Sequence, residues 1–310
     1  MKNRKKKILI IGGTGFIGYY LSKICLKKNW DVTSISTKKP KNNRFIKEVK
    51  YILCDITKKI LLKKRIKENY DFVVNLGGYV DHSNKIKTYK SHYVGCKNLA
   101  DFFIKRKITT FVQMGSSIEN GNQKSPQTVA KLSNFKKIKS VYGKAKLKSS
   151  IYLLNLFKKK KFPVVIFRLY LVYGPGQDIN RFLPIIINGC LNNETFATSH
   201  GKQKRDFIFI DDVINAIIKS LVIKNSIGKI LNLGTGKPQK LFKIINKIIK
   251  MCKGGKANFG KVLIRSDEIL NLYPDINYTK FILNWKPKID FKNGLIKTVN
   301  FYKRNNAKFS

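Results

Sequence analysis

Short hydrophobic runs alternate with amphipathic stretches along the first half of the chain. The hydrophobic runs lie at residues 8–11, 31–36, 51–54, 72–76, 109–114 and 162–169. Runs of this length are typical of buried parallel strands. Helical spacing of apolar residues follows the first run and recurs at 58–69, 87–106 and 141–160. Strands that alternate with helices predict an α/β fold with a Rossmann-type, doubly wound parallel sheet.

Three glycines follow the first run at three-residue spacing, namely Gly12, Gly15 and Gly18. In a strand–turn–helix unit, such glycines permit a tight turn, close approach of the backbone to a pyrophosphate, and close packing of the helix on the strand. The helix N-terminus presents free N–H groups and its positive dipole end to the phosphates. The motif therefore predicts a dinucleotide-binding site at the start of the chain.

The residues that end the second run indicate which dinucleotide binds. An acidic residue at this place would bond the ribose 2′-hydroxyl of NAD. This chain has Ser36, Thr37, Lys38 and Lys39 instead. Hydroxyls and a cation suit a 2′-phosphate, so we favour NADP, with NAD as the alternative.

The pattern becomes less regular after residue 169. The elements expected there are a turn at 173–177, a helix at 181–192, a strand and a helix within 204–222, a strand and turn at 230–238, and a helix near 240–252. Asp211 or Asp212 is expected to cap the helix that follows the 204–209 region. We expect residues 1–169 to form the dinucleotide-binding domain, with segments near 204–236 returning to it. Residues 170–310 would form mainly a smaller C-terminal substrate-binding portion.

The chain is strongly basic, with 64 Lys+Arg, 17 Asp+Glu and a net charge of +47 in 310 residues. One interpretation is binding to nucleic acid or to an acidic membrane surface. The other is compositional bias, because the lysines are spread along the whole chain, whereas a binding footprint clusters. We favour compositional bias and expect no nucleic-acid partner. An RNA-binding protein of this fold stays the alternative from another functional class.

Targeting and metal signals are weak. No apolar run reaches the ~18 residues of a membrane span, and glycines interrupt the run after the basic N-terminus, without a signal-peptide cleavage site. The five cysteines are scattered, which predicts reduced thiols. The three histidines, His82, His92 and His200, show no metal-ligand spacing. We expect a cytoplasmic protein without a membrane partner or a metal site.

The spacing Tyr-x-x-x-Lys occurs three times, at Tyr19–Lys23, Tyr93–Lys97 and Tyr142–Lys146. Spacing alone cannot choose among them in so basic a chain. The third pair begins a long predicted helix, 25 residues after Ser117, which follows a strand. A free tyrosine has a pKa near ~10, so it needs a nearby cation such as Lys146 to favour the phenolate. We expect Tyr142 to exchange the proton of a carbinol, Ser117 to bond the reacting oxygen, and Lys146 to hold the nicotinamide ribose.

Several further segments share one family resemblance. They are GGTGFIG (12–18), Asp55 after YILC, LGG (76–78), GSSIENG (115–121), VYGKAK (141–146), RLYLVYGPGQ (168–177), KRDFIFIDDV (204–213), LNLGTG (231–236) and LNWKPKIDFKNGL (283–295). Over nearly its whole length the chain resembles the extended short-chain dehydrogenase/reductases, and among them the NAD-dependent epimerase/dehydratase family, which acts on nucleotide sugars. The segments NRFLPIII and RDFIFIDDVINA resemble the subgroup of deoxyhexose 4-ketoreductases typified by CDP-abequose synthase.

The resemblance implies contacts for most residues of the site. The implied cofactor contacts are Gly12, Gly15, Phe16, Ile17, Gly18, Ser36, Lys38, Asp55, Leu76, Gly77, His92, Tyr142 and Lys146. The implied substrate contacts are Glu119, Arg181, Arg205 and Arg265. Guanidinium groups suit a diphosphate, which we expect Arg205 and Arg265 to bind. The resemblance also implies a homodimer through the helices near 87–106 and 141–160.

Departures from the family narrow the predicted reaction. The 4,6-dehydratases have an Asp-Glu pair where this chain has Ile118-Glu119, and loss of the acid argues against elimination of water. Leu171 stands where the family usually has Asn, and Asn120-Gly121 replaces Tyr-Gly. We expect an NAD(P)-dependent oxidoreductase that reduces a 4-keto-6-deoxyhexose nucleotide. A nucleotide-sugar 4-epimerase with bound NAD is the alternative.

Overall fold

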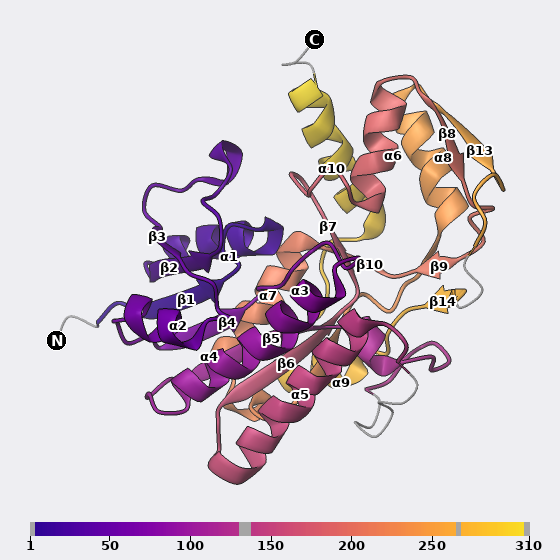
Figure 1. Cartoon of the computed structure of the whole chain (residues 1–310). Helices are drawn as coiled ribbons and strands as arrows, with labels where there is room; N and C mark the ends of the chain where they lie inside the picture. The colour runs from indigo at the N-terminus through magenta and orange to yellow at the C-terminus, as the bar shows by residue number, and fades with distance from the viewer. Residues whose placement is uncertain (1–3, 130–137, 265–267, 307–310) are drawn as a thin grey trace.

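A parallel sheet of seven strands, in the order β11-β6-β5-β4-β1-β2-β3, forms the centre of the molecule (Figure 1). The computed structural model describes residues 4–129, 138–264 and 268–306. The strands of the sheet are β1 Lys7–Ile11, β2 Asp31–Ser36, β3 Lys50–Leu53, β4 Phe72–Asn75, β5 Thr110–Ser116, β6 Val164–Leu169 and β11 Ile230–Leu233. Every neighbouring pair is parallel. The predicted Rossmann-type, doubly wound sheet is confirmed.

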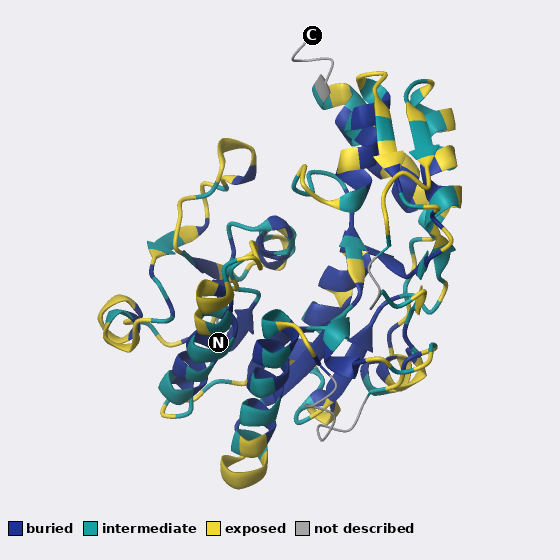
Figure 2. Ribbon diagram, turned by 45° about the vertical axis from the view of Figure 1, so that its right-hand side comes forward, coloured by how far each residue is buried: buried dark blue, intermediate teal, exposed yellow. Residues whose placement is uncertain are grey.

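Helices cover both faces of the sheet. They are α1 Phe16–Lys27, α2 Lys59–Arg65, α3 Lys85–Tyr89, α4 Gly95–Phe103, α5 Val141–Lys160 and α7 Ile210–Val222. Successive residues of β1 divide between two hydrophobic clusters: Ile8 and Ile10 join the cluster of α1 and α7, whereas Leu9 and Ile11 join that of α2, α4 and α5. Figure 2 shows the buried residues concentrated in the sheet and on the helix faces turned toward it. The strand is therefore apolar on both sides, as its unbroken hydrophobic run predicts.

The remaining elements lie mainly beyond residue 169. They are β7 Leu171–Tyr173, α6 Phe182–Leu191, β8 Thr195–Thr198, β9 Lys204–Arg205, β10 Phe207–Phe209, β12 Gln239–Lys240, α8 Leu241–Cys252, β13 Lys256–Phe259, β14 Asn271–Leu272, α9 Asn277–Leu283 and α10 Phe291–Asn306. Helices α6, α8 and α10 pack on one another, apart from the helices that cover the sheet (Figure 1). In the sequence between α6 and α8, β11 returns to the edge of the sheet beside β6. The division into two domains at residue 169 stays a prediction.

Two predicted helices differ from the structure in informative ways. The helix expected at 87–106 consists of α3, a π-helical turn at Lys90–Val94, and α4. Such turns occur frequently at functional sites. Helix α7 is preceded by Phe209 rather than capped by an aspartate, so that prediction is wrong. Asp212 lies in the first turn, where its carboxylate accepts the backbone N–H groups of Lys288 (2.8 Å) and Ile289 (3.0 Å).

Helix α5 has the bounds that the sequence predicts. The Ser140 hydroxyl oxygen accepts the N–H of Gly143 (3.1 Å) and caps the first turn. Lys161, with φ of 55°, ends the helix in the left-handed conformation. Across the described residues, α5 included, no helix combines the length and hydrophobicity needed to cross a bilayer.

Candidate active site

Three adjoining cavities follow the carboxyl ends of the sheet strands. The turn cavity, of about 340 Å³, lies against the glycine turn and the ends of β2 and β3. The central cavity, of about 410 Å³, shares Gly12, Gly15 and Leu76 with it. The outer cavity, of about 400 Å³, shares Ser117 and Tyr142 with the central cavity. Together they form one groove, at the edge where ligands bind in folds of this kind.

The glycine turn fits a pyrophosphate. Gly12 has a φ of +76°, which favours glycine, and a Cβ atom on Gly18 would lie 2.5 Å from the Gly12 carbonyl oxygen. Helix α1 starts directly after Gly15, and within the described residues no side chain caps its first N–H groups. Phe16 and Ile17 line the central cavity beside them. The turn thus presents backbone donors and the positive end of a helix dipole to the groove.

The far end of the turn cavity is polar and lacks an acid next to β2. Ser36 and Lys38 line it, and the Ser36 hydroxyl accepts a hydrogen bond from Thr14 Oγ1 (2.9 Å). Asp55 lines it from the end of β3, where its carboxylate accepts the N–H of Thr57 (2.9 Å). Gly77 and Leu76 form its floor at the end of β4. These residues are brought together as the sequence predicts, and the cavity fits the adenosine half of a dinucleotide.

Ser117, Tyr142 and Lys146 meet at the middle of the groove. Ser117 begins a short 3-10 helix, Ser117–Asn120, directly after β5. Tyr142 lies in the first turn of α5, and Lys146 follows one turn later, with Nζ 5.9 Å from the centre of the Tyr142 ring. Only 5% of Lys146 is exposed, and its ammonium donates to the Met114 carbonyl oxygen (2.6 Å). A hydroxyl, a phenol and a buried ammonium in one cavity can move a proton to or from a ligand oxygen.

Two imidazole rings surround the phenol of Tyr142. His82 stacks on the Tyr142 ring with centroids 4.0 Å apart and planes 17° from parallel. His92 meets the same ring at 4.9 Å and 78°. Burial, with the nearby Lys146 ammonium, lowers the pKa of His92 to about 2. Sequence analysis placed His92 in the site but missed His82, because a ring contact between a loop and a helix 60 positions later leaves no local signal.

Glu119 lies beneath the groove rather than in it. It is 1% exposed, and its carboxylate accepts the Ser116 N–H (2.8 Å) and the Ser150 hydroxyl (2.5 Å). Arg168 Nε lies 3.8 Å away. Glu119 lines none of the three cavities. The expectation of a substrate contact is therefore corrected: Glu119 forms a capping box with Ser116 that fixes the position of Ser117.

The expected arginines occupy different places. Arg181 lines the central cavity, just before α6. Arg205 lines the outer cavity, where its guanidinium is paired with Glu268 and donates to the Leu270 carbonyl oxygen (3.3 Å). Burial lowers the pKa of Arg205. Arg265 lies outside the described residues.

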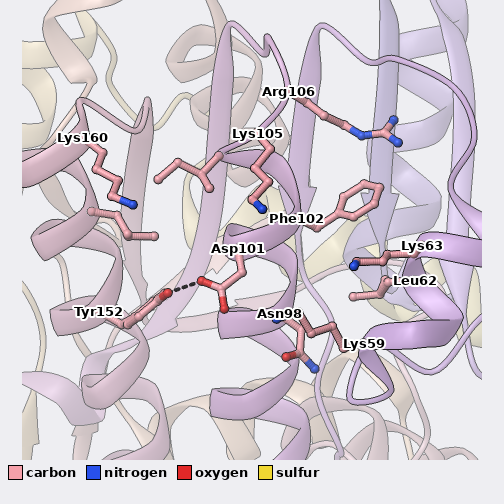
Figure 3. Close-up of a pocket in the computed structure, with 12 residues that line it drawn as sticks. Lys59, Leu62, Lys63, Asn98, Asp101, Phe102, Lys105, Arg106, Tyr152 and Lys160 are labelled. Atoms are coloured by element: carbon pink, nitrogen blue, oxygen red, sulfur yellow. Dashed lines mark hydrogen bonds between the residues drawn. The ribbon is translucent and has the colours of Figure 1, made fainter.

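A further cavity, of about 520 Å³, lies on the outer face of α2, α4 and α5, away from the groove. Figure 3 shows Asp101 and Tyr152 meeting across this cavity, with Phe102 beside them and basic side chains around them. The basic residues that line it are Lys59, Lys63, Lys105, Arg106 and Lys160. None of the residues placed in the groove by sequence analysis lines this cavity.

Comparisons with known proteins identify the family of the chain and several similar proteins. The model of the NAD dependent epimerase/dehydratase family matches residues 8–234. CDP-abequose synthase of Salmonella typhimurium is 26% identical over 94% of this chain and 96% of its own length. The dTDP-D-glucose 4,6-dehydratase of Dictyostelium discoideum is 26% identical over 97% of this chain and 82% of its own.

A solved structure shows the same fold. The UDP-glucuronic acid 4-epimerase of Bacillus cereus, in complex with UDP-glucuronic acid and NAD, superposes with a TM-score of 0.81. It is 23% identical, and the match covers 96% of this chain and 99% of that one. The proteins that this chain resembles thus include an epimerase, a dehydratase and a synthase.

Proposed function

The chain belongs to the NAD-dependent epimerase/dehydratase family, whose members are enzymes of nucleotide sugars, and we propose that it reduces a 4-keto-6-deoxyhexose nucleotide with NADPH. The observation that carries this proposal is that the described carboxylates in the central and outer cavities are paired with arginines. Elimination of water from a sugar needs an acid and a base beside the reacting carbons, and in the 4,6-dehydratases that the chain resembles an Asp-Glu pair supplies them. A reductase needs only a proton donor beside the carbonyl group.

Among the described residues, one carboxylate lines the central cavity and one lines the outer cavity. Each of the two is paired with an arginine. Asp178 pairs with Arg44 (3.0 Å), and Glu268 pairs with Arg205. Glu119 is buried in its own hydrogen bonds. With Ile118 in place of the dehydratase aspartate, the described residues of the central and outer cavities offer no carboxylate without an arginine partner to act as acid or base on the sugar. This supports reduction over dehydration.

Tyr142 would donate its phenolic proton to the carbonyl oxygen of the sugar as C4 is reduced. Ser117 would hold that oxygen by a hydrogen bond, because both residues line the boundary between the central and outer cavities. The Lys146 ammonium would stabilise the phenolate that forms, and its bond to Met114 keeps it beside the phenol. A bound NADPH would supply the hydride, with Ser36 and Lys38 at its 2′-phosphate.

The groove also supports a deoxy sugar. Leu171 and Val80 line the central cavity, and both side chains are exposed there. They offer an apolar surface where the family usually has an asparagine at position 171, and such a surface suits a methyl group better than a hydroxyl. Arg181 and Arg205 flank this region and suit the diphosphate. Arg205 would bind the phosphate while it stays paired with Glu268.

The bound nucleotide and the product test this function together. We would denature the purified protein and identify any released nucleotide by mass spectrometry. We would then offer NADPH or NADH with CDP- and dTDP-linked 4-keto-6-deoxyhexoses and identify the product by NMR. Reduction that prefers NADPH supports the proposal. Stoichiometric bound NAD and interconversion of 4-epimers, without net oxidation of the added cofactor, would replace the reductase with an epimerase.

We also propose that two copies associate through the outer faces of α4 and α5. Phe102 and Tyr152 contribute partly buried apolar surface to this face. Light scattering after size-exclusion chromatography should give twice the chain mass for the wild type and the monomer mass for Phe102→Glu. A wild-type monomer at micromolar concentration would refute this part of the proposal and leave the reaction untouched.

A further inference from the structure

The Tyr142 phenol is enclosed more closely than proton transfer alone requires. His82 covers one face of the ring, His92 meets it at a steep angle, and the two imidazoles lie 5.9 Å apart. All three rings line the central cavity. The histidines come from different elements: His82 from the loop after β4, and His92 from the π-helical turn at Lys90–Val94.

We propose that His82 and His92 are positioning residues that clamp the ring of Tyr142 and keep its hydroxyl directed at the reacting oxygen. This inference rests on the proposed function for the reaction, but the clamp itself is a property of the protein alone. A phenol on the first turn of a helix can rotate about its side-chain bonds. Contacts on two sides of the ring restrict that rotation, and restricted geometry raises the rate of proton transfer.

His92 is the fixed side of the clamp. Its Nε2 lies 3.1 Å from the Tyr79 carbonyl oxygen, and because a carbonyl only accepts, Nε2 carries the proton. A Cβ atom on Gly78 would lie 1.9 Å from His92 Cε1, so only glycine leaves room for the ring. The Ser149 hydroxyl donates to the His92 carbonyl oxygen (2.7 Å), which ties the π-helical turn to the helix that bears Tyr142.

His82 is the accessible side of the clamp. It is exposed on the loop that leads to α3, and its ring lies against Tyr142 in the cavity. Desolvation of the ring where it stacks on Tyr142, together with the charges of Arg181 and Lys146, lowers the pKa of His82, against the opposing influence of Asp81. The neutral form of the stacked ring is therefore favoured, which avoids a third cation in the site. Its exposure also means that substitutions should leave the fold intact.

The first experiment observes the clamp without any ligand. The chain has three histidines, so a carbon–proton NMR spectrum of the imidazoles contains three sets of signals. His82→Ala and His200→Ala assign the exposed pair. Because Tyr142 lies over the His82 ring, its ring current should shift the His82 protons upfield, and Tyr142→Leu should abolish the shift. His82 signals that are the same in both proteins would overturn the clamp.

The second experiment measures its effect on the reaction. His82→Ala should lower kcat about tenfold, the upper range for one aromatic pair, whereas the KM for NADPH changes less than about twofold. His82→Phe restores a ring without a titratable nitrogen, so it should recover most of kcat. His200→Ala is the matched control, because His200 is exposed and lies outside the three cavities.

Each other outcome is decisive. Equal losses in His82→Ala and His82→Phe would show that the imidazole acts chemically or contacts the sugar, and would overturn a positioning role. A higher kcat in His82→Ala would show that the ring obstructs the site instead. If the wild type reduces no 4-keto nucleotide sugar, the proposed function fails, and the NMR result still decides whether the clamp exists.

Discussion

The pairs Tyr142–Lys146 and Tyr93–Lys97 have the same spacing on neighbouring helical segments and opposite surroundings. Lys146 is 5% exposed, and its ammonium donates to a backbone carbonyl at the bottom of the groove. The Lys97 side chain is 42% exposed and pairs with Asp101 (2.6 Å) on the outer face of α4. The Lys146 ammonium lies beside the Tyr142 phenol in the cavity, with its charge available to that phenol. The Lys97 ammonium is balanced at the surface by the carboxylate of Asp101.

A four-residue spacing therefore acquires chemistry only from the groups that pack around it. Lys146 approaches the ring of its own tyrosine, whereas Lys97 lies 5.1 Å from the ring of Tyr152. The π-helical turn at Lys90–Val94 contains Tyr93 and changes the direction in which residues four apart point. Burial, rather than spacing, should therefore separate the two pairs, and matched substitutions in each pair can show this.

The largest effect is expected at the phenol itself. Tyr142→Phe removes the proposed proton donor and should lower kcat for reduction by about 10²- to 10⁴-fold, the range for a general acid. Tyr93→Phe, the matched change in the other pair, should stay within about twofold of the wild type. Steady-state NADPH oxidation measures both. A comparable loss of kcat in Tyr93→Phe would mean that burial does not identify the pair that carries the proton transfer.

The next effect is a difference in stability between the loss of a buried ion pair and the loss of an exposed one. Glu119→Ala leaves Arg168 buried without its carboxylate and should lower the free energy of unfolding by about 3–5 kcal/mol. Lys97→Ala removes an exposed pair and should cost less than about 1 kcal/mol. Urea titration followed by circular dichroism compares the two. Similar small losses would show that the network under Ser117 is not a structural support.

A pH dependence should come from His92. Its pKa falls from the usual value to about 2 in the folded protein, so below pH ~6.5 the unfolded chain binds a proton that the folded chain does not. Stability from this group is thus present above pH ~6.5 and is lost as the pH falls. Between pH 6.5 and 5 the loss should reach about 2 kcal/mol.

His92→Gln should remove the loss of stability between pH 6.5 and 5. His200→Gln, at an exposed position, should retain that loss. Denaturant titrations at several pH values give the slope for each protein. A wild-type slope that His92→Gln leaves unchanged would show that other buried groups, such as Asp206 and Asp212, dominate. Those two carboxyl groups have raised pKa values because of burial, so their effect has the opposite sign: it favours the folded state at acid pH.

Local patterns predicted the sheet, the glycine turn and helix α5 well. Each depends on residues close in sequence: an unbroken hydrophobic run, a three-residue glycine spacing, and the helical spacing of apolar residues over 141–160. The same patterns placed Ser117, Tyr142 and Lys146 in one groove, although their roles stay predictions. The family resemblance added Asp55 and Arg205, which also line the groove.

Features that depend on long-range packing could not be predicted in this way. Glu119 was expected at the substrate, because the sequence does not show that Ser150 and Arg168 would enclose it. Glu268 was not foreseen as the partner of Arg205, 63 positions away. The contact of His82 with Tyr142 belongs to the same class. These residues depend on which elements the sheet brings side by side, and a single sequence carries little signal for that.

The smallest effect is expected at two neighbouring exposed lysines, which burial alone does not distinguish. Lys38 lines the turn cavity, and its neighbour Lys39 does not, although both are exposed. Lys38→Ala should raise the KM for NADPH about tenfold and leave the KM for NADH nearly unchanged, because one charge contact to a phosphate contributes about 1.4 kcal/mol. Lys39→Ala should change neither. Equal effects on the two cofactors would mean that Lys38 contributes only general positive charge. Selective loss for NADPH would show that a surface lysine, like a buried one, acquires its role from the cavity that it lines.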